Sequence, residues 1–297
     1  MENHITIYEV GPRDGLQNEA INIPTEIKIE FINHLSETGL TKIEATSFVS
    51  PKWVPQLADN ASVMQGITRN PKVKYSVLIP NIAGLELALP HAPNEIAVFT
   101  AASETFSQKN TNCSIKQSME RVEKIAAVAR ARHIPFRGYI SCVLGCPYEG
   151  EVPIKKTVEL AEKLIKLGCY QVSLGDTIGV GTAHKTKKLI DAVAAAIGVD
   201  KVAVHFHDTY AQALTNIYVS LEAGVTTFDS SVGGLGGCPY APGAGGNVAT
   251  EDVVYLLNGL GLHCGVDLIK LINASKTVQH FLQRPTRSKV ALALDSG

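Results

Sequence analysis

Two histidines interrupt an otherwise apolar segment of the chain, V-A-V-H-F-H-D, at residues 202–208. If this segment is a β-strand, His205 and His207 leave the same face, because side chains alternate along a strand. A single inward histidine is more often a hydrogen-bonded core residue. Two on one face, followed at once by Asp208, favour a metal site or a catalytic site, because imidazole nitrogens are common metal ligands.

Charged residues also stand in or after other apolar segments. Arg13 and Asp14 follow the segment 6–11 within G-P-R-D-G, where a turn with a surface ion pair would explain the pair taken alone. Glu44 lies inside K-I-E-A-T-S, and Asp176 comes near the end of another apolar segment. A carboxylate is costly to bury unless it is paired. Buried ion pairs are therefore the alternative to catalytic roles for these acids.

A glycine-rich stretch, S-S-V-G-G-L-G-G-C-P-Y-A-P-G-A-G-G-N-V-A-T-E-D, covers residues 230–252. This composition suits a loop that closes over a substrate or brings its backbone close to a ligand. Cys238 lies in its middle, in a setting where a thiol is more exposed than in a core. Asn247 and Glu251 follow, at or just before a predicted helix. The alternative is a glycine-rich loop with an incidental thiol.

Eight short β-branched segments alternate with longer amphipathic segments along the chain. Ser114 followed by Gln117 is a helix N-terminal signal, and another helix is predicted over 153–168. Strands alternating with helices favour a parallel sheet, and eight repeats favour a closed (β/α)8 TIM barrel over an open doubly wound sheet. The predicted strands are 6–11, 42–47, 74–79, 95–101, 136–143, 170–177, 201–208 and 226–232.

We expect a single catalytic domain over residues 1–297, with the barrel at about 5–260 and additional helices at about 261–297. In such a barrel the active site forms at the carboxyl ends of the strands, where the charged residues and histidines described above fall.

The composition excludes several classes of partner. The 297 residues are 45% hydrophobic and carry a net charge of -1, so there is no basic excess for nucleic acid or an anionic membrane. No apolar run approaches the roughly 20 residues that span a bilayer. A predicted strand begins soon after Met1, which leaves no room for a targeting peptide. Six cysteines without paired short spacings predict free thiols, and together these features predict a cytoplasmic protein.

Taken together, the motifs resemble the 3-hydroxy-3-methylglutaryl-CoA (HMG-CoA) lyase family over nearly the whole chain. The motifs are G-P-R-D-G-L-Q-N-E, E-A-T-S-F-V-S-P-K-W-V-P-Q-L-A-D, K-N-T-N-C-S, G-Y-I-S-C-V-L-G-C-P-Y-E-G, S-L-G-D-T-I-G-V-G-T, H-F-H-D-T-Y-A-Q-A-L and G-G-L-G-G-C-P-Y-A-P-G-A-G-G-N-V-A-T-E-D. Gly245 departs from the family, whose members usually carry threonine there. That departure bears on loop flexibility more than on chemistry.

The resemblance implies a carbon–carbon lyase that cleaves HMG-CoA to acetyl-CoA and acetoacetate with Mg²⁺ or Mn²⁺, and it suggests a homodimer. It places the metal ligands at Asp14, His205, His207 and Asn247, and catalytic roles at Arg13, Cys238, Asp176 and Glu44. Glu251 and Gln17 are expected to support the site, and Arg13, Ser47, Asn110 and Thr177 to contact the substrate.

The implied chemistry agrees with these residue types. One carboxylate, one amide oxygen and two imidazoles suit an octahedral Mg²⁺ or Mn²⁺, with two positions left for a hydroxyl and a carboxylate oxygen of the substrate. In a retro-Claisen cleavage, Arg13 would stabilise the enolate oxygen and Cys238 would transfer a proton. The general base stays open among a ligating histidine, Asp14 and Cys238.

Three alternatives share parts of this pattern. Condensing synthases of the isopropylmalate or homocitrate type have R-D-G and H-x-H, but usually continue into further domains and lack the cysteine loop. A metal-dependent aldolase acting on a pyruvate-type product is more distant. A catalytically silent barrel would have lost the arginine, a ligand or the cysteine. The residues of the coenzyme A pocket, and the choice between leucine breakdown and ketone-body formation, are not fixed by the sequence.

Overall fold

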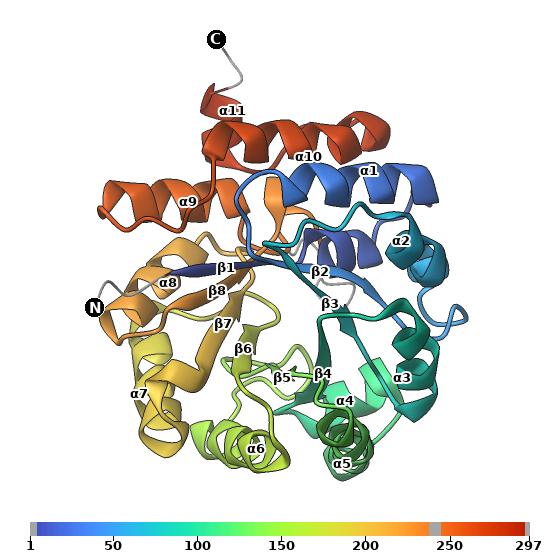
Figure 1. Cartoon of the computed structure of the whole chain (residues 1–297). Coiled ribbons are helices and arrows are strands. Elements are labelled where there is room, and N and C mark those ends of the chain that lie inside the picture. Colours follow the sequence, from blue (N-terminus) through green and yellow to red (C-terminus); the bar gives the residue numbers. More distant parts are fainter. Residues whose placement is uncertain (1–4, 238–244, 295–297) are drawn as a thin grey trace.

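Eight parallel strands close into a barrel in this computed structural model, which describes residues 5–237 and 245–294 (Figure 1). Each strand pairs with the next along the chain, and β8 pairs with β1 to complete the ring. The closed ring confirms the predicted (β/α)8 TIM barrel and excludes the open sheet. The strands are β1 (Thr6–Glu9), β2 (Lys42–Ser47), β3 (Lys74–Leu78), β4 (Glu95–Ala101), β5 (Phe136–Ser141), β6 (Val172–Asp176), β7 (Val202–Phe206) and β8 (Thr227–Ser230).

Helices surround the barrel, and two short helical turns follow its first and last strands. The predicted signals are present. Ser114 and Gln117 form a reciprocal capping box at the start of the helix 115–131, and Gly168, with a φ of 106°, ends the helix 154–167. The helices are α1 (Thr25–Ser36), α2 (Asn60–Gly66), α3 (Ile82–Ala88), α4 (Glu104–Thr111), α5 (Ile115–Ala131), α6 (Ile154–Leu167), α7 (Ala183–Ile197), α8 (Ala213–Glu222), α9 (Thr250–Gly259), α10 (Leu268–Leu282) and α11 (Lys289–Leu294); the turns used below are η1 (Gly11–Gly15) and η5 (Val232–Gly234).

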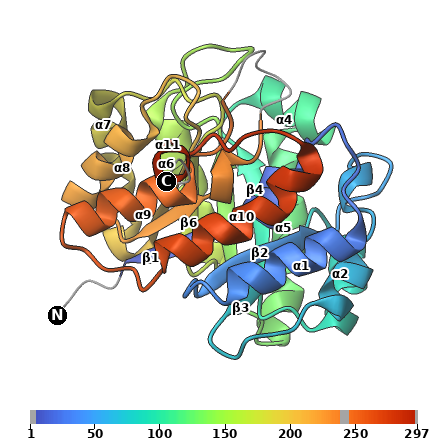
Figure 2. The same cartoon turned by 90° about the horizontal axis from the view of Figure 1, so that it is seen from above.

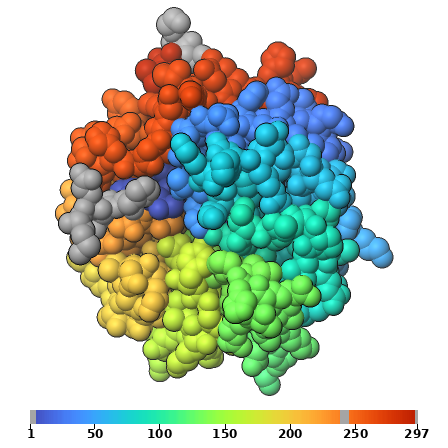
Figure 3. Space-filling model, in the orientation of Figure 1, coloured from blue at the N-terminus to red at the C-terminus, as the bar shows by residue number. Residues whose placement is uncertain are grey.

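The segment after the barrel forms the additional helices that the sequence predicted. Figures 1 and 2 both show α10 lying beside α1. In the space-filling view of Figure 3, segments follow one another around the molecule in chain order, so the last helices lie next to the first. No helix in the described ranges is long and apolar enough to cross a membrane.

The two faces of each strand pack against different parts of the molecule. On β7, Val202, Val204 and Phe206 are buried in the apolar core shared with the helices, as the alternation predicted. The alternate positions point into the barrel, where the filling is unusually polar. Arg137 on β5 and Asp229 on β8 are both fully buried there and are joined by an ion pair of 2.9 Å.

Candidate active site

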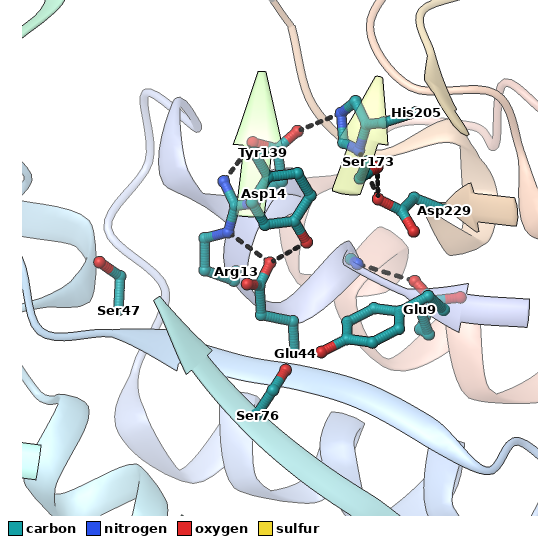
Figure 4. A network of polar contacts seen from close by, with 12 residues as sticks. Glu9, Arg13, Asp14, Glu44, Ser47, Ser76, Tyr139, Ser173, His205 and Asp229 are labelled. Carbon is teal, nitrogen blue, oxygen red and sulfur yellow. Dashed lines mark hydrogen bonds and ion pairs between the residues drawn. The ribbon is translucent and has the colours of Figure 1, made fainter. Parts of the chain in front are cut away.

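Arg13 is held in a fixed position at the mouth of the barrel. It lies in η1, directly after β1, and is 6% exposed. Its Nε donates to Glu44 Oε2 at 2.7 Å, and its Nη1 donates to Asp14 Oδ1 at 2.5 Å (Figure 4). Burial disfavours the charge, but the two carboxylates raise the pKa of Arg13 above its usual value. The guanidinium is therefore a permanent, oriented cation.

Glu44 is the centre of this arrangement. Its side chain is fully buried, and its Oε2 also accepts a hydrogen bond of 3.2 Å from the Tyr139 hydroxyl. The Tyr139 ring in turn lies 5.5 Å from the Arg13 guanidinium. Burial raises the pKa of Glu44, and Arg13 opposes that rise. The described contacts of Glu44 fix Arg13 from one side. The catalytic role predicted for Glu44 stays a prediction.

A candidate metal centre adjoins Arg13. One ligand atom each from Asp14, His205 and His207 lie within 4.8 Å of one another. Asp14 Oδ2 is 3.7 Å from His205 Nε2. Burial would raise the pKa of Asp14, but Arg13 and the two histidines hold it well below its usual range. A charged carboxylate beside two imidazoles is a donor set that fits a divalent cation.

His207 itself fits this assignment. Its Nδ1 is buried and has no hydrogen-bond partner among the residues that the structure describes. Such a nitrogen is costly unless something binds it. Burial, followed by the neighbouring His205, lowers the pKa of His207 to about 4. The imidazole is therefore neutral at pH 7, which is the form that binds metals.

Asn247 reaches the same place from the far end of the glycine-rich segment. An isolated bridge pairs its backbone with that of His207, and its Nδ2 donates to Asp14 Oδ2 at 2.8 Å and to Leu235 O at 3.1 Å. The four predicted ligands are thus brought together. The contact that the structure shows is made by the amide nitrogen, so ligation through the amide oxygen stays a prediction.

Sequence reasoning missed Asp229, which lies behind His205. His205 Nδ1 is 3.4 Å from Asp229 Oδ2, on the ring side away from Asp14. Asp229 is fixed by Ser173 Oγ at 2.7 Å and by Arg137 at 2.9 Å. Burial opposes its charge, but Arg137 and His205 lower the pKa of Asp229. A carboxylate on the second nitrogen orients a metal-binding imidazole.

Two buried carboxyl groups support the segments that carry the site. Both oxygens of Glu251 accept from the Gly233 N–H, at 2.9 and 2.8 Å. Glu9, which the sequence did not single out, accepts from the N–H groups of Gly11 and Val232 at 2.8 and 3.0 Å. Burial raises the pKa of Glu251 to about 8 and that of Glu9 to about 7. Glu9 thus ties η1 to η5, and Glu251 ties α9 to η5. The supporting role of Glu251 stays a prediction.

Asp176 lies elsewhere. Its carboxylate accepts from the N–H groups of Val180 and Gly181 at 3.2 and 2.8 Å, and it occupies the face of β6 opposite that of Ser173, which points inward. Burial raises the pKa of Asp176 to about 6. None of its described hydrogen bonds reaches Arg13 or the metal cluster. The structure thus shows it holding the loop after β6, and a catalytic role stays a prediction.

The remaining predicted residues surround the mouth. The Ser47 hydroxyl accepts from Val49 N at 3.2 Å and is drawn apart from the Arg13 contacts in Figure 4. The Thr177 hydroxyl accepts from Cys142 N at 2.9 Å. Asn110 lines a small pocket that also borders the ends of β4 and β5.

Gln17 and Cys238 complete the set. Gln17 is half-buried beyond η1, and its Oε1 has no hydrogen-bond partner within the described ranges. Cys238 falls outside the described residues. The cysteines that are described, Cys113, Cys142, Cys146, Cys169 and Cys264, are not in disulfide bonds.

Comparison with known proteins places the chain in a family. The family model described as HMGL-like matches residues 4–278. The chain belongs to the HMGL-like family. It is 56% identical over 289 residues to the mitochondrial hydroxymethylglutaryl-CoA lyase of Gallus gallus, covering 97% of each chain. It is 55% identical over 293 residues to the cytoplasmic 3-hydroxy-3-methylglutaryl-CoA lyase of Rattus norvegicus, covering 99% of this chain and 85% of the relative.

A solved structure agrees with these relatives. The crystal structure of hydroxymethylglutaryl-CoA lyase from Pseudomonas aeruginosa superposes with a TM-score of 0.97 at 54% identity, covering 99% of this chain and 98% of that one. The family resemblance and the fold predicted from the sequence are therefore confirmed. The names of HMGL-like relatives include both cytoplasmic and mitochondrial proteins, so they leave the predicted compartment untested.

Proposed function

We propose that this chain cleaves HMG-CoA to acetyl-CoA and acetoacetate at the cluster formed by Arg13, Asp14, His205 and His207. The enzyme class, a carbon–carbon lyase, was predicted from the motifs and is confirmed by full-length relatives of this name. The observation that carries the site is the juxtaposition of a fixed guanidinium with one carboxylate and two imidazoles at the mouth of the barrel.

The donor set would hold a divalent cation, Mg²⁺ or Mn²⁺, through Asp14, His205 and His207, with Asn247 as the fourth ligand. When bound, that cation would supply Lewis-acid activation of the C3 hydroxyl and orientation of the substrate. Imidazole nitrogens favour Mn²⁺ over Mg²⁺, whereas carboxylate and amide oxygens suit both. Asp229 supports the site by fixing the orientation of His205.

Arg13 would stabilise the enolate. Cleavage of the C2–C3 bond leaves negative charge on the thioester oxygen of the departing acetyl-CoA unit. A cation that is already oriented stabilises that charge without reorganising during the reaction. Glu44 and Tyr139 hold Arg13 in this orientation from within the barrel.

Proton transfer is assigned to Cys238. The thiol would protonate the enolate or carry the proton away from the C3 hydroxyl, and no acyl-cysteine is needed because the reaction has no acyl acceptor. Ser47, Asn110 and Thr177 are proposed substrate contacts, Asp176 keeps the catalytic role predicted for it, and Gln17 and Glu251 are proposed to support the site. The position of Asn110 beside the ends of β4 and β5 supports its assignment.

The proposal is tested by acetoacetate release from HMG-CoA with Mg²⁺ or Mn²⁺. We expect release to stop with EDTA, to return with added Mn²⁺, and to be lost in Cys238→Ser. Cys264→Ser is the matched control, because that buried thiol lies in the connection between α9 and α10, outside the proposed site, and should leave the rate unchanged. Absence of release by the wild-type protein, with condensation of acetyl-CoA and a 2-oxo acid instead, would overturn the assignment.

We further propose a homodimer in the cytoplasm that acts on a small CoA thioester as one catalytic domain, without nucleic-acid or membrane partners. The near-neutral net charge supports the absence of nucleic-acid and membrane partners, and the free thiols support a reducing compartment. Sedimentation equilibrium measures the assembly: a mass of one chain would contradict the dimer.

A further inference from the structure

Arg287 lies in the segment 283–288, which connects α10 to α11, and its side chain binds two backbone carbonyls of the glycine-rich segment. Its Nη1 donates to Gly236 O at 2.7 Å and to Gly245 O at 2.7 Å. The backbone N–H of Arg287 donates to Gly233 O at 3.0 Å. One guanidinium nitrogen therefore joins the two ends of the stretch 237–244, which contains Cys238.

The backbone around these carbonyls is tightly packed. Gly236 has a φ of 115° and Gly246 a φ of 78°, and a side-chain carbon added to Gly246 would overlap the Gly236 oxygen. Two carbonyl dipoles that point at the same place repel each other, and each needs a donor when it is removed from water. The Arg287 cation donates to both carbonyls at once, so it offsets their repulsion where the two backbone ends cross.

This crossing helps to place Asn247, together with the backbone bridge from Asn247 to His207. Gly236 follows Leu235, whose carbonyl accepts from Asn247 Nδ2, and Gly245 precedes Asn247 by two residues. Arg287 thus holds both the backbone that carries Asn247 and the backbone that orients its amide. No contact links Arg287 to Asp14 or to the histidines within the described ranges, so its effect on the site passes through the glycine-rich segment.

We propose that Arg287 is a positioning residue for the lyase reaction, which holds the two ends of the glycine-rich segment together and so places Asn247 beside Asp14. This inference rests on the proposed function, in which Asn247 is a metal ligand. It gives the segment after α10 a task at the active site, in addition to packing on the barrel.

Arg284 offers a matched control on the same segment. It binds a side chain and not the glycine-rich backbone: its Nη2 lies 2.5 Å from Glu19 Oε1. Arg284→Met removes an ion pair between the same segment and the body of the protein, whereas Arg287→Met removes the contact between the two backbone ends. A general loosening of the segment would affect both variants alike.

The experiment compares wild type, Arg287→Met, Arg287→Lys and Arg284→Met in three measurements: acetoacetate release, Mn²⁺ affinity of the apo protein by electron paramagnetic resonance, and thermal unfolding. For Arg287→Met we expect kcat to fall about tenfold or more and Mn²⁺ to bind about tenfold more weakly, as for loss of other groups that orient a ligand. Its unfolding temperature should match that of Arg284→Met. Arg287→Lys should recover part of both losses, because an ammonium can also donate to two carbonyls.

Wild-type kcat and Mn²⁺ affinity in Arg287→Met would overturn the inference, as would equal losses in Arg284→Met. Failure of the proposed function is recognised separately, since wild type itself would then release no acetoacetate. Hydrogen exchange keeps the inference testable in that case: the amides of residues 245–249 should exchange faster in Arg287→Met than in Arg284→Met. Equal exchange in the two variants would overturn it.

Discussion

Two buried arginines, Arg13 and Arg137, share the same tyrosine and use nearly the same chemistry at different depths of the barrel. The guanidinium of Arg13 lies 5.5 Å from the Tyr139 ring, and that of Arg137 lies 5.0 Å from it. Each pairs with a carboxylate on a strand: Arg13 with Glu44 of β2 at 2.7 Å, and Arg137 with Asp229 of β8 at 2.9 Å. Both pairs satisfy the rule that a buried charge needs a partner.

The surroundings differ. Arg13 follows the end of β1, and its second partner, Asp14, is 22% exposed at the mouth. Arg137 is inside β5, fully buried, and its guanidinium also lies 4.0 Å from the Tyr8 ring. A cation at the mouth can meet charge that develops on a substrate. A cation enclosed in the barrel can only organise its neighbours, here Asp229 and through it His205. In the proposed function, the same pair of residue types would serve catalysis in one place and positioning in the other.

The comparison predicts that substituting Arg13 lowers kcat, whereas substituting Arg137 lowers stability. The largest effect is expected for the substitution of Arg13. We expect Arg13→Gln to lower kcat by about 10³-fold, equivalent to about 4 kcal/mol of transition-state stabilisation, because the enolate loses its cation. The fold should persist, since burial raises the pKa of Glu44 and that carboxyl group can take up a proton when its partner is gone. Steady-state kinetics and urea unfolding measure the two quantities, and a variant with near-wild-type kcat would refute the assignment.

Arg137→Met should show the reverse. Removing one partner of a buried ion pair leaves an uncompensated charge, here on Asp229, and typically costs about 3–5 kcal/mol of unfolding free energy. We expect the loss of stability in urea to exceed that of Arg13→Gln, and the kcat per folded molecule to fall far less than in that variant. If Arg137→Met were as stable as wild type, the enclosed pair would not be the structural member of the comparison.

Much of this arrangement could be predicted from local sequence. Alternation within single strands was enough to place His205 and His207 on one inward face, and the eight repeats were enough to close the sheet. The same alternation explains why Asp176 was harder to interpret. It shares the face of Leu174, which packs in the core with the helices, so its parity directs it away from the barrel interior.

The partners of these residues could not be predicted in the same way. Asp229 lies inside a predicted strand, as Glu44 does, and that signal was available. Its pairing with Arg137 and His205 depends on the register of β5, β7 and β8, which a single sequence does not specify. The contacts of Arg287 are even harder to predict from the sequence. Its acceptors are backbone carbonyls, which every residue has, so residue types do not indicate them.

Asp229 connects the two regions, and its substitution should have the smallest effect of the three. Asp229→Asn keeps the shape but removes the negative charge 3.4 Å from His205 Nδ1, and that charge favours the tautomer with Nδ1 protonated and Nε2 facing Asp14. We expect Mn²⁺ to bind the apo protein about 10–100-fold more weakly, with a smaller loss of stability than in Arg137→Met. Ser173→Ala is the control, because it removes only one hydrogen bond to the same carboxylate. Calorimetric titration with Mn²⁺ decides the matter: if Asp229→Asn and Ser173→Ala bound the ion equally well, the link from the enclosed arginine to the metal site would be lost.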